Sequence, residues 1–422
     1  MLNKIKKICE KACPSVYYRV QKTYWHILGL PHTVSGTYTN FKKQISDYLK
    51  IQKNIRSIIS RANQTGHMVI YPYNINWNVA LYQRPHHFAN FISQKGIPFV
   101  FVTDDKLNPF FWVNQNLLVI DESYYNHLLK SIGKHKKNKL KTFLLLPSTN
   151  PFITTDDILK LKNDGFGLIY DYIDKIDEEI SPQNIDLQLR RHKDILNMGL
   201  ADLVLCVSDL LYKEALEYMP PEKVLLIENA VDYNHFHISR DPNNVPSRLK
   251  SIVEQKKPII GYYGAIAPWI DIDLINEVAS RRKDWNFVLI GPDYDGQTTK
   301  KIKKLQNIHY LGPVDYQELP NYAIWFDVAT IPFKRGEIAK TTSPIKLYEY
   351  MALNKPIVST ADMDECKKYR SPLIAHDTND FILQIERALQ LKDDPEYLRL
   401  VDEEARRNTW EARVERIIQA LR

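Results

Sequence analysis

The stretch Thr341–Val358, TTSPIKLYEYMALNKPIV, predicts a helix that leads directly into a buried strand. Ser343 before Pro344 marks the start of the helix, because a serine hydroxyl can accept the first free amides and a proline at the first helical position loses no hydrogen bond. The apolar run that begins at Pro356 is typical of a strand. A helix followed at once by a strand is the repeating unit of an α/β protein.

Lys346 falls in the first turn of this predicted helix. That end of a helix carries partial positive charge and favours Asp or Glu, so a lysine there is unfavourable unless an anion lies beside it. Two explanations are open at this point. Either the ammonium group binds an anion at the start of the helix, or it extends into solvent and pairs with Glu349 or Tyr350 one turn further on.

The alternation of short apolar runs and longer helical stretches continues along the chain. Runs this continuous are typical of strands buried on both faces, as in a parallel sheet with helical crossovers. The segment after Val231, DYNHFHISRDPNNVPSR, is rich in Asn, Asp and Pro and is predicted to link two series of runs. The first series begins at Met68, Phe99, Leu117, Thr142, Gly167, Asp202 and Val224, and the second at Pro258, Asn286, Ile308, Asp327, Pro356 and Pro372.

Two doubly wound α/β domains, each large enough to bury a stable core, account for most of the 422 residues. We expect the first domain over residues 66–235 and the second over residues 236–405, with residues 1–65 as a helical extension and residues 406–422 as an amphipathic helix. The apolar face of that last helix docks either within its own domain or across the cleft. It consists of Trp410, Val414, Ile417, Ile418 and Leu421.

The N-terminal extension is strongly basic. Residues 1–65 contain twelve Lys or Arg and two acidic residues, whereas the rest of the chain contains 45 basic and 48 acidic residues. Apolar residues recur at helical spacing from Ile5 to Ala12 and from Ile45 to Ile58, and basic amphipathic helices suit an anionic lipid surface. The alternative is a solvated helical hairpin packed on the first domain. A second basic run, 128–141, strengthens the membrane hypothesis only if both runs share one face.

Other features predict a cytoplasmic protein. No apolar run approaches the roughly 20 residues of a membrane span, and the N-terminus lacks the apolar core of a signal peptide. Cys9, Cys13, Cys206 and Cys366 provide no disulfide framework, and the first two lack the partners that would complete a zinc site. We therefore expect a cytoplasmic chain that binds peripherally, through its basic extension, to the inner face of the cell membrane.

From about residue 66 to its end, the chain resembles bacterial GT-B glycosyltransferases of family 4, the glycosyl transferases group 1, in a branch that works on surface polysaccharides. The resemblance implies two Rossmann-like domains that face a cleft. The stretches that carry it, in order, are QRPHHFANF at Gln83, YDYID at Tyr170, ADLVLCVSDLL at Ala201, IENAVD at Ile227, GYYGAIAPWIDIDLI at Gly261, VLIGP at Val288, YLGPVDYQELP at Tyr310, IPF at Ile331 and SPIKLYEYMALNKPIV at Ser343.

The resemblance implies a donor site in the second domain. In this family the diphosphate of a nucleotide sugar binds at a helix N-terminus, and a glutamate on that helix, here Glu349 in the helix Pro344–Ala352, bonds the ribose hydroxyls. Lys346 would then face a phosphate, which removes the electrostatic conflict at the helix start. Gly264 lets the backbone approach the diphosphate. The implied donor-binding residues are Gly264, Trp269, Thr341, Thr342, Ser343, Pro344, Ile345, Lys346 and Glu349.

Two positions depart from the pattern of the family. Many members carry another glutamate eight positions before the one that bonds ribose, whereas this chain has Thr341. Many also place an Arg and a Lys after the glycine that opens the second domain, where this chain has Trp269, Asp271 and Asp273. We therefore expect Lys346 to carry more of the phosphate charge and the donor sugar to differ from the common glucose-type ones. Asp271 is expected to cap a helix.

The first domain is expected to supply contacts to the acceptor across the cleft. Arg84 is expected to pair with an acidic acceptor or a lipid phosphate, His87 to bond sugar hydroxyls or assist proton transfer, and Asp171 to hold an acceptor hydroxyl. The alternatives are a packed helix residue for either histidine of the pair and a helix cap for the carboxylate. The predicted catalytic residues are Lys346, Glu349, His87 and Asp171, and the predicted acceptor-binding residues are Asn76, Gln83, Arg84, His86 and Asp174.

The activity implied is that of a retaining glycosyltransferase of the hexosyl type, which moves a sugar from a nucleotide sugar to a glycan or lipid-linked glycan. Such chemistry depends on stabilising an oxocarbenium-like transition state and the departing diphosphate. No cofactor, essential metal or nucleic-acid partner is expected. A nicotinamide-dependent oxidoreductase would need a GxGxxG turn, which neither domain has. Two alternatives stay open: a catalytically degenerate GT-B protein acting as a membrane-associated scaffold, and a nucleotide-sugar epimerase.

Overall fold

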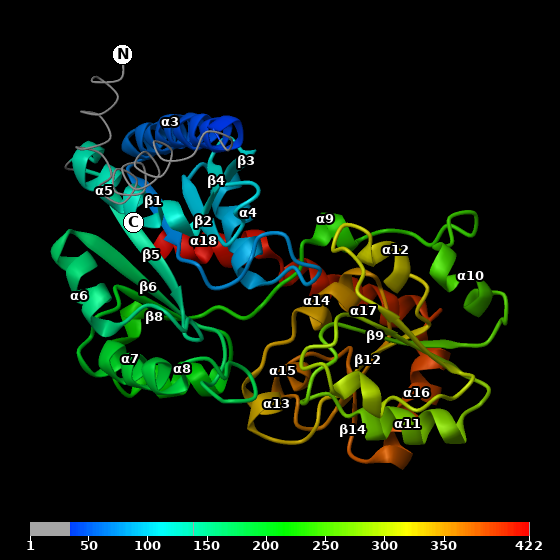
Figure 1. Cartoon of the computed structure of the whole chain (residues 1–422). Coiled ribbons are helices and arrows are strands. Elements are labelled where there is room, and N and C mark those ends of the chain that lie inside the picture. The colour runs from blue at the N-terminus through cyan, green and yellow to red at the C-terminus, as the bar shows by residue number, and fades with distance from the viewer. Residues whose placement is uncertain (1–33, 138, 422) are drawn as a thin grey trace. The chain divides into compact units, whose positions relative to one another are not determined.

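The computed structural model describes residues 34–137 and 139–421 (Figure 1). The chain divides into two compact units, residues 1–57 and 58–422. Helix α3 (Val34–Thr65) begins in the first unit and ends in the second. It includes the predicted helical stretch from Ile45 to Ile58, whereas the stretch from Ile5 to Ala12 lies outside the described residues.

The first sheet contains the seven predicted runs and one further strand. Its order is β3-β4-β2-β1-β5-β6-β7-β8, and all neighbours are parallel except β3 and β4. The further strand is β3, FFWVN, which lies at the edge and is only half-buried. The strands are β1 (His67–Tyr71), β2 (Phe99–Thr103), β3 (Phe110–Asn114), β4 (Leu117–Asp121), β5 (Lys141–Pro147), β6 (Phe166–Tyr172), β7 (Leu203–Cys206) and β8 (Val224–Leu226).

The second sheet contains the six runs of the second predicted series. All its neighbours are parallel in the order β11-β10-β9-β12-β13-β14, which is the order of a Rossmann sheet. The prediction of two doubly wound α/β sheets is confirmed. The strands are β9 (Ile259–Tyr263), β10 (Asn286–Ile290), β11 (Ile308–Gly312), β12 (Val328–Ile331), β13 (Ile357–Thr360) and β14 (Leu373–Ala375).

Helices connect the strands of both sheets. In the first domain they are α4 (Arg84–Gln94), α5 (Tyr125–His135), α6 (Thr155–Asn163), α7 (Ile185–Asn197) and α8 (Asp209–Leu216), with 3-10 turns at Glu122–Tyr124 and Pro221–Lys223. The later helices are α9 (Tyr233–Phe236), α10 (Ser247–Val253), α11 (Ile272–Arg281), α12 (Leu319–Ala323), α13 (Glu337–Thr341), α14 (Ile345–Ala352), α15 (Asp364–Lys367), α16 (Thr378–Leu391), α17 (Pro395–Arg407) and α18 (Trp410–Leu421), with a 3-10 turn at Thr298–Lys301.

Asp271 caps helix α11, as predicted. Its side chain accepts a hydrogen bond of 2.9 Å from the amide of Leu274. A carboxylate at this end of a helix also interacts favourably with the helix dipole. The side chain therefore has a structural explanation that needs no ligand.

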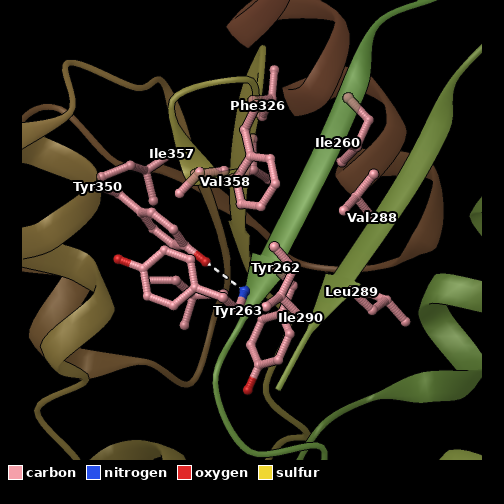
Figure 2. Close-up of a cluster of buried hydrophobic side chains, with 14 of the residues drawn as sticks. Ile260, Tyr262, Tyr263, Val288, Leu289, Ile290, Phe326, Tyr350, Ile357 and Val358 are labelled. Carbon is pink, nitrogen blue, oxygen red and sulfur yellow. Dashed lines mark hydrogen bonds between the residues drawn. The ribbon is translucent and has the colours of Figure 1, made fainter. Parts of the chain in front are cut away.

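The core of the second sheet holds helix α14 close to the end of β9. Tyr262 and Tyr263 at the end of β9, and Tyr350 of α14, are buried among aliphatic side chains (Figure 2). The Tyr350 hydroxyl accepts a 3.0 Å hydrogen bond from the backbone amide of Tyr263, and the two rings meet edge to face. Tyr350 of α14 is therefore hydrogen-bonded to the backbone amide of Tyr263, the last residue of β9.

The last helix, α18, packs on α4 of the first domain (Figure 1). Four of its apolar side chains belong to the core of the first sheet, and Trp410 stacks on His87 with 4.7 Å between ring centroids. Just before α18 the chain comes back to the end of the first domain, where Thr409 forms a parallel β-bridge with Val231. Of the two docking sites expected for this helix, the structure shows the one on the first domain.

Truncation of the Trp410 side chain is expected to destabilise the fold. Trp410→Ala removes a fully buried indole that contacts both His87 and Phe88, and such truncations cost about 3–5 kcal/mol. Urea denaturation followed by circular dichroism measures the loss. Leu383→Ala, at a side chain that is 59% exposed, is the control and should change the free energy of unfolding by less than about 0.5 kcal/mol. Equal losses in the two variants would contradict the docking of α18.

Candidate functional site

A pocket of about 250 Å³ lies at the carboxyl ends of strands from both sheets. This is the edge at which doubly wound sheets bind ligands. Segments after β1, β6, β9 and β12 line the pocket, together with the first turns of α14. The lining includes the predicted residues Gln83, Arg84, Asp174, Gly264, Trp269, Thr342, Ser343, Pro344, Ile345, Lys346 and Glu349.

The start of α14 differs from the prediction. The helix begins at Ile345, with Pro344 as its N-cap residue, and no side chain caps it. The Ser343 hydroxyl instead accepts a 3.2 Å hydrogen bond from the amide of Asn229 and lies 3.0 Å from the hydroxyl of Tyr348. The amides of the first turn are therefore left without a capping side chain at a place that lines the pocket.

Lys346 lies beside Gly264, as the predicted phosphate site requires. Gly264 has a φ of +134°, and a Cβ atom there would come within 2.8 Å of Lys346 Cε, so a larger residue is excluded. The Lys346 ammonium lies 5.5 Å from the ring centre of Tyr262 and 5.3 Å from that of Phe333. Burial lowers the pKa of Lys346 to about 8, against the attraction of Glu349.

Lys346 is not a solvent-exposed partner of Glu349. The lysine side chain is only partly exposed, and no salt bridge joins it to a carboxylate within the described part of the chain. A partly buried ammonium group without an ion pair is unfavourable, and a bound anion would offset that cost. The geometry therefore favours the anion-binding explanation of this residue.

Glu349 is buried at the same pocket, three residues further along α14. Its Oε2 atom accepts a 2.8 Å hydrogen bond from the Tyr263 hydroxyl. Burial raises the pKa of Glu349 to about 7, while the Tyr263 hydroxyl and Lys346 oppose that rise. Because the amide of Tyr263 is also bonded to Tyr350, this tyrosine is fixed at both ends and holds the carboxylate in place. Tyr263 was not among the predicted site residues.

Arg84 and Asp171 pair with each other, which corrects the roles predicted for both. Arg84 Nη2 lies 3.0 Å from an Asp171 oxygen, and both side chains are almost fully buried. Asp171 is inside strand β6 and does not line the pocket. Arg84 does line it, but its charge is neutralised by the partner, so it is not free to pair with an acidic acceptor.

Arg84 also connects the first domain to the start of α14. Its Nη1 donates a 3.2 Å hydrogen bond to the side-chain oxygen of Asn229. The Asn229 side-chain nitrogen donates a 2.6 Å hydrogen bond to the carbonyl of Ser343. Asn229, in the motif IENAVD, therefore joins an arginine of the first domain to the segment before α14, although it was not itself predicted as a site residue.

Neither histidine of the predicted acceptor site faces the pocket. His86 Nδ1 accepts a hydrogen bond from the amide of Gln83, and its Nε2 lies 3.0 Å from the carbonyl of Asn76. The His87 ring is buried against Trp410. Burial lowers the pKa of His86 to about 4 and that of His87 well below its ordinary value, so both are neutral near pH 7. The packed-residue alternative holds for both, and the role predicted for His87 is corrected.

Two further predicted residues are used inside the fold. The Asn76 side-chain oxygen accepts a 2.9 Å hydrogen bond from the amide of Asp104. The Thr341 hydroxyl donates a 2.8 Å hydrogen bond to the carbonyl of Glu337 in its own helix. The predicted residues outside the pocket lining are therefore Asn76, His86, His87, Asp171 and Thr341.

Asp174 is the carboxylate of the first domain that lines the pocket. Burial and the neighbouring Asp171 raise the pKa of Asp174 to about 7, while Arg84 opposes the rise. Tyr316 lines the pocket as well, stacked on Tyr82 at 4.5 Å, and its buried hydroxyl has no hydrogen-bond partner among the described residues. An unpaired buried hydroxyl and a carboxyl group that titrates near neutral pH are typical of ligand sites.

No group of three or more His, Cys, Asp or Glu side chains in residues 34–137 and 139–421 is arranged to hold a metal ion. No helix in the same residues is sufficiently long and apolar to span a membrane.

The raised pKa of Glu349 predicts a pH-dependent cost to stability. The free energy of unfolding should fall as pH rises from about 4.5 to about 7, because the carboxyl group ionises more readily in the unfolded chain. Glu349→Gln should therefore be more stable than the wild type at pH 8, by about 1–3 kcal/mol, and the difference should vanish near pH 4. Denaturant titrations across this range measure it.

Glu254→Gln, at an exposed carboxylate at the end of α10, is the control for this prediction and should show no such pH dependence. A Glu349→Gln variant that is less stable than the wild type at pH 8 would contradict the unfavourable burial of the ionised carboxylate.

Residues 257–391 match the family model described as glycosyl transferases group 1. A curated protein of Bacillus subtilis (strain 168), provisionally named teichuronic acid biosynthesis glycosyltransferase TuaH, is 31% identical over 258 residues, which cover 58% of this chain and 64% of the relative. The match thus spans less than two thirds of that relative's length.

Solved structures with low sequence identity share the fold. The HepE protein of Anabaena, solved in complex with UDP and glucose, superposes with a TM-score of 0.61 at 12% identity, over 84% of this chain and 99% of the other. Sucrose-phosphate synthase of Thermosynechococcus elongatus gives a TM-score of 0.60 at 13% identity, over 84% and 98% of the two chains. The chain therefore has the predicted GT-B fold, and its residues 257–391 match the model of the glycosyl transferases group 1.

Proposed function

We propose that this protein is a retaining glycosyltransferase that moves a sugar from a nucleotide sugar to a glycan or lipid-linked glycan during the synthesis of a cell-surface polysaccharide. The observation that carries the proposal is the uncapped start of α14, where Lys346 and Gly264 meet and Glu349 follows one turn later. The name of the Bacillus subtilis relative and the UDP bound to HepE support it.

The diphosphate of the donor would bind at the start of α14. The free amides of the first turn, the helix dipole and the Lys346 ammonium all favour negative charge at this place. Gly264 allows the backbone to come close to the phosphates without a side chain in between. The same groups would stabilise the charge that develops on the leaving diphosphate, which makes Lys346 the main catalytic residue of the proposal.

The ribose of the donor would lie at Glu349. One carboxylate oxygen accepts the hydrogen bond of Tyr263, which leaves acceptor capacity for the two ribose hydroxyls. A carboxylate that binds hydroxyls must be ionised, so ligand binding would lower the pKa of Glu349 below its value of about 7 in the free protein.

Asp174 would serve the acceptor. It is the predicted acceptor-binding carboxylate that lines the pocket, and its pKa of about 7 suits a group that takes a proton from an acceptor hydroxyl. Gln83 lines the same pocket and can donate to sugar oxygens. Asp174 thus takes the place in the proposal that His87 and Asp171 cannot fill.

The membrane would be contacted through the basic extension, at the cytoplasmic face. Beyond the sequence of residues 1–65, one contact supports this part of the proposal. Asn63, near the end of α3, donates to the carbonyl of His135 at 3.0 Å and accepts from the amide of Lys137 at 2.8 Å. One end of the extension therefore contacts the second basic run. Basic residues from both segments that lie close together would add to the attraction of the protein to an anionic membrane surface.

Lys346→Ala is expected to weaken nucleotide binding. The loss of one charge-assisted contact to phosphate costs about 1.5–3 kcal/mol, or roughly 10-fold to 150-fold in Kd. Thermal shifts with UDP, GDP, dTDP and CMP identify the base, and isothermal titration calorimetry with the best nucleotide then compares the variants. Lys300→Ala, an exposed lysine outside the pocket, is the control. Failure of every nucleotide to bind the wild type would favour the degenerate scaffold.

Nucleotide affinity is expected to be highest between about pH 7 and pH 8. Below this range Glu349, with a pKa of about 7, becomes protonated and accepts fewer hydrogen bonds from ribose. Above it Lys346, with a pKa of about 8, loses the charge that faces the phosphates. Calorimetric titrations from pH 5.5 to pH 9.5 test both limbs. In Glu349→Gln the acidic limb should disappear while the alkaline limb stays; an unchanged profile would contradict the assignment.

A further inference from the structure

The pocket is lined by two groups of residues that differ in chemistry. The polar group includes Glu349, Tyr263 and the unpaired hydroxyl of Tyr316. The apolar group includes Phe333, whose ring lies 5.3 Å from the Lys346 ammonium. The backbone amide of Lys334, the residue after Phe333, donates a 2.8 Å hydrogen bond to the Trp269 carbonyl. This bond holds Phe333 close to Trp269. The apolar group is called the apolar section below.

The apolar section is closed by a contact between loops of the two domains. The Tyr294 ring meets Trp269 at 5.0 Å, and the Tyr294 hydroxyl donates a 2.7 Å hydrogen bond to the carbonyl of Ile180. Tyr294 therefore contacts both Trp269 and Ile180, and both of these residues line the pocket. The lining residues that these segments contribute are Ile173, Asp174, Ile180, Ala265, Trp269, Phe333, Ile338 and Thr342.

Few polar side chains reach the apolar section. Of the residues that line it, only Asp174 and Thr342 carry a carboxylate or a hydroxyl group. Thr341 does not contribute, since its hydroxyl is bonded within α13 and it is buried outside the pocket. Ile180 and Ile338 offer only hydrocarbon, and a sugar hydroxyl pressed against them would lose its hydrogen bonds to water without replacement.

We propose that the apolar section receives the sugar of the donor and that this sugar carries a methyl group, as in a 6-deoxyhexose or an N-acetylhexosamine. The inference rests on the proposed function, which places the diphosphate at Lys346 and the ribose at Glu349, so that the sugar extends towards Trp269. The Trp269 ring offers a flat apolar surface for the sugar face, and Ile180 and Ile338 offer a place for the methyl group. A uronic acid is disfavoured, because its carboxylate would lie in the same section as Asp174.

Matched donors test the inference by calorimetry. The nucleoside diphosphate that binds best is measured first without a sugar and then carrying glucose, 6-deoxyglucose, N-acetylglucosamine or glucuronic acid. The expected result is that 6-deoxyglucose or N-acetylglucosamine lowers Kd at least about fourfold relative to glucose, which corresponds to one buried methyl group at about 0.8 kcal/mol. If 6-deoxyglucose shows the gain in affinity, the methyl group is that of a 6-deoxy sugar; if N-acetylglucosamine shows it, the methyl group is that of an N-acetyl group. Tighter binding of glucose or glucuronic acid would overturn the inference.

Variants of the apolar section provide the second arm. Ile338→Thr and Ile180→Thr should each reduce the preference for the methylated sugar while leaving the affinity for the sugar-free nucleotide unchanged. Ile382→Thr, at a half-buried isoleucine of α16 outside the pocket, is the matched control and should leave the preference intact. A preference that survives both pocket variants would overturn the assignment of the section. Absence of binding by the sugar-free nucleotide would overturn the proposed function as well, which distinguishes the two failures.

Discussion

The contact between β9 and α14 fixes the candidate site, and much of the pocket depends on it. Tyr263 bonds Tyr350 through its backbone amide and Glu349 through its hydroxyl, so two consecutive residues of the helix are tied to the end of one strand. Gly264 follows at once, and its lack of a side chain leaves room for the side chain of Lys346. The strand end and the helix start therefore form one rigid piece, and a ligand meets it already arranged.

The buried pair of Arg84 and Asp171 in the first domain is connected to this rigid piece through Asn229. Arg84 is buried with Asp171, and its remaining bond to Asn229 continues to the carbonyl of Ser343. Such a buried ion pair contributes little net stability, but leaving one partner alone is costly, so the pair fixes the position of Arg84. Hydrogen bonds between residues far apart in the sequence thus fix the position of the first domain relative to the segment before α14.

Most strands of the two sheets could be predicted from the sequence, whereas only some of the residues that line the pocket could, and the reasons are physical. Strands buried on both faces appear as continuous apolar runs, whereas β3 is a half-buried edge strand and was missed. Ser343 was expected to cap α14, but its hydroxyl contacts Asn229 and Tyr348 instead, and a local pattern cannot show a partner as distant in the sequence as Asn229. Lys346 was identified because a charge at a helix start conflicts with a local rule, and conflicts of this kind mark ligand sites. His87 was misassigned because the surface that buries its ring belongs to α18, more than 300 residues later in the chain.

Helix α18 gives the protein an unusual order of assembly during synthesis. The helix contains the last described residues to leave the ribosome, yet Trp410, Val414, Ile417 and Leu421 fill part of the core that surrounds the first sheet. Until α18 has been made, the face of α4 that receives these side chains stays uncovered, so the first domain cannot reach its final packing while the second is being made. The core of the first domain therefore depends on a helix that follows the second domain in the chain, and without it the apolar face of α4 would be open to solvent and to chaperones.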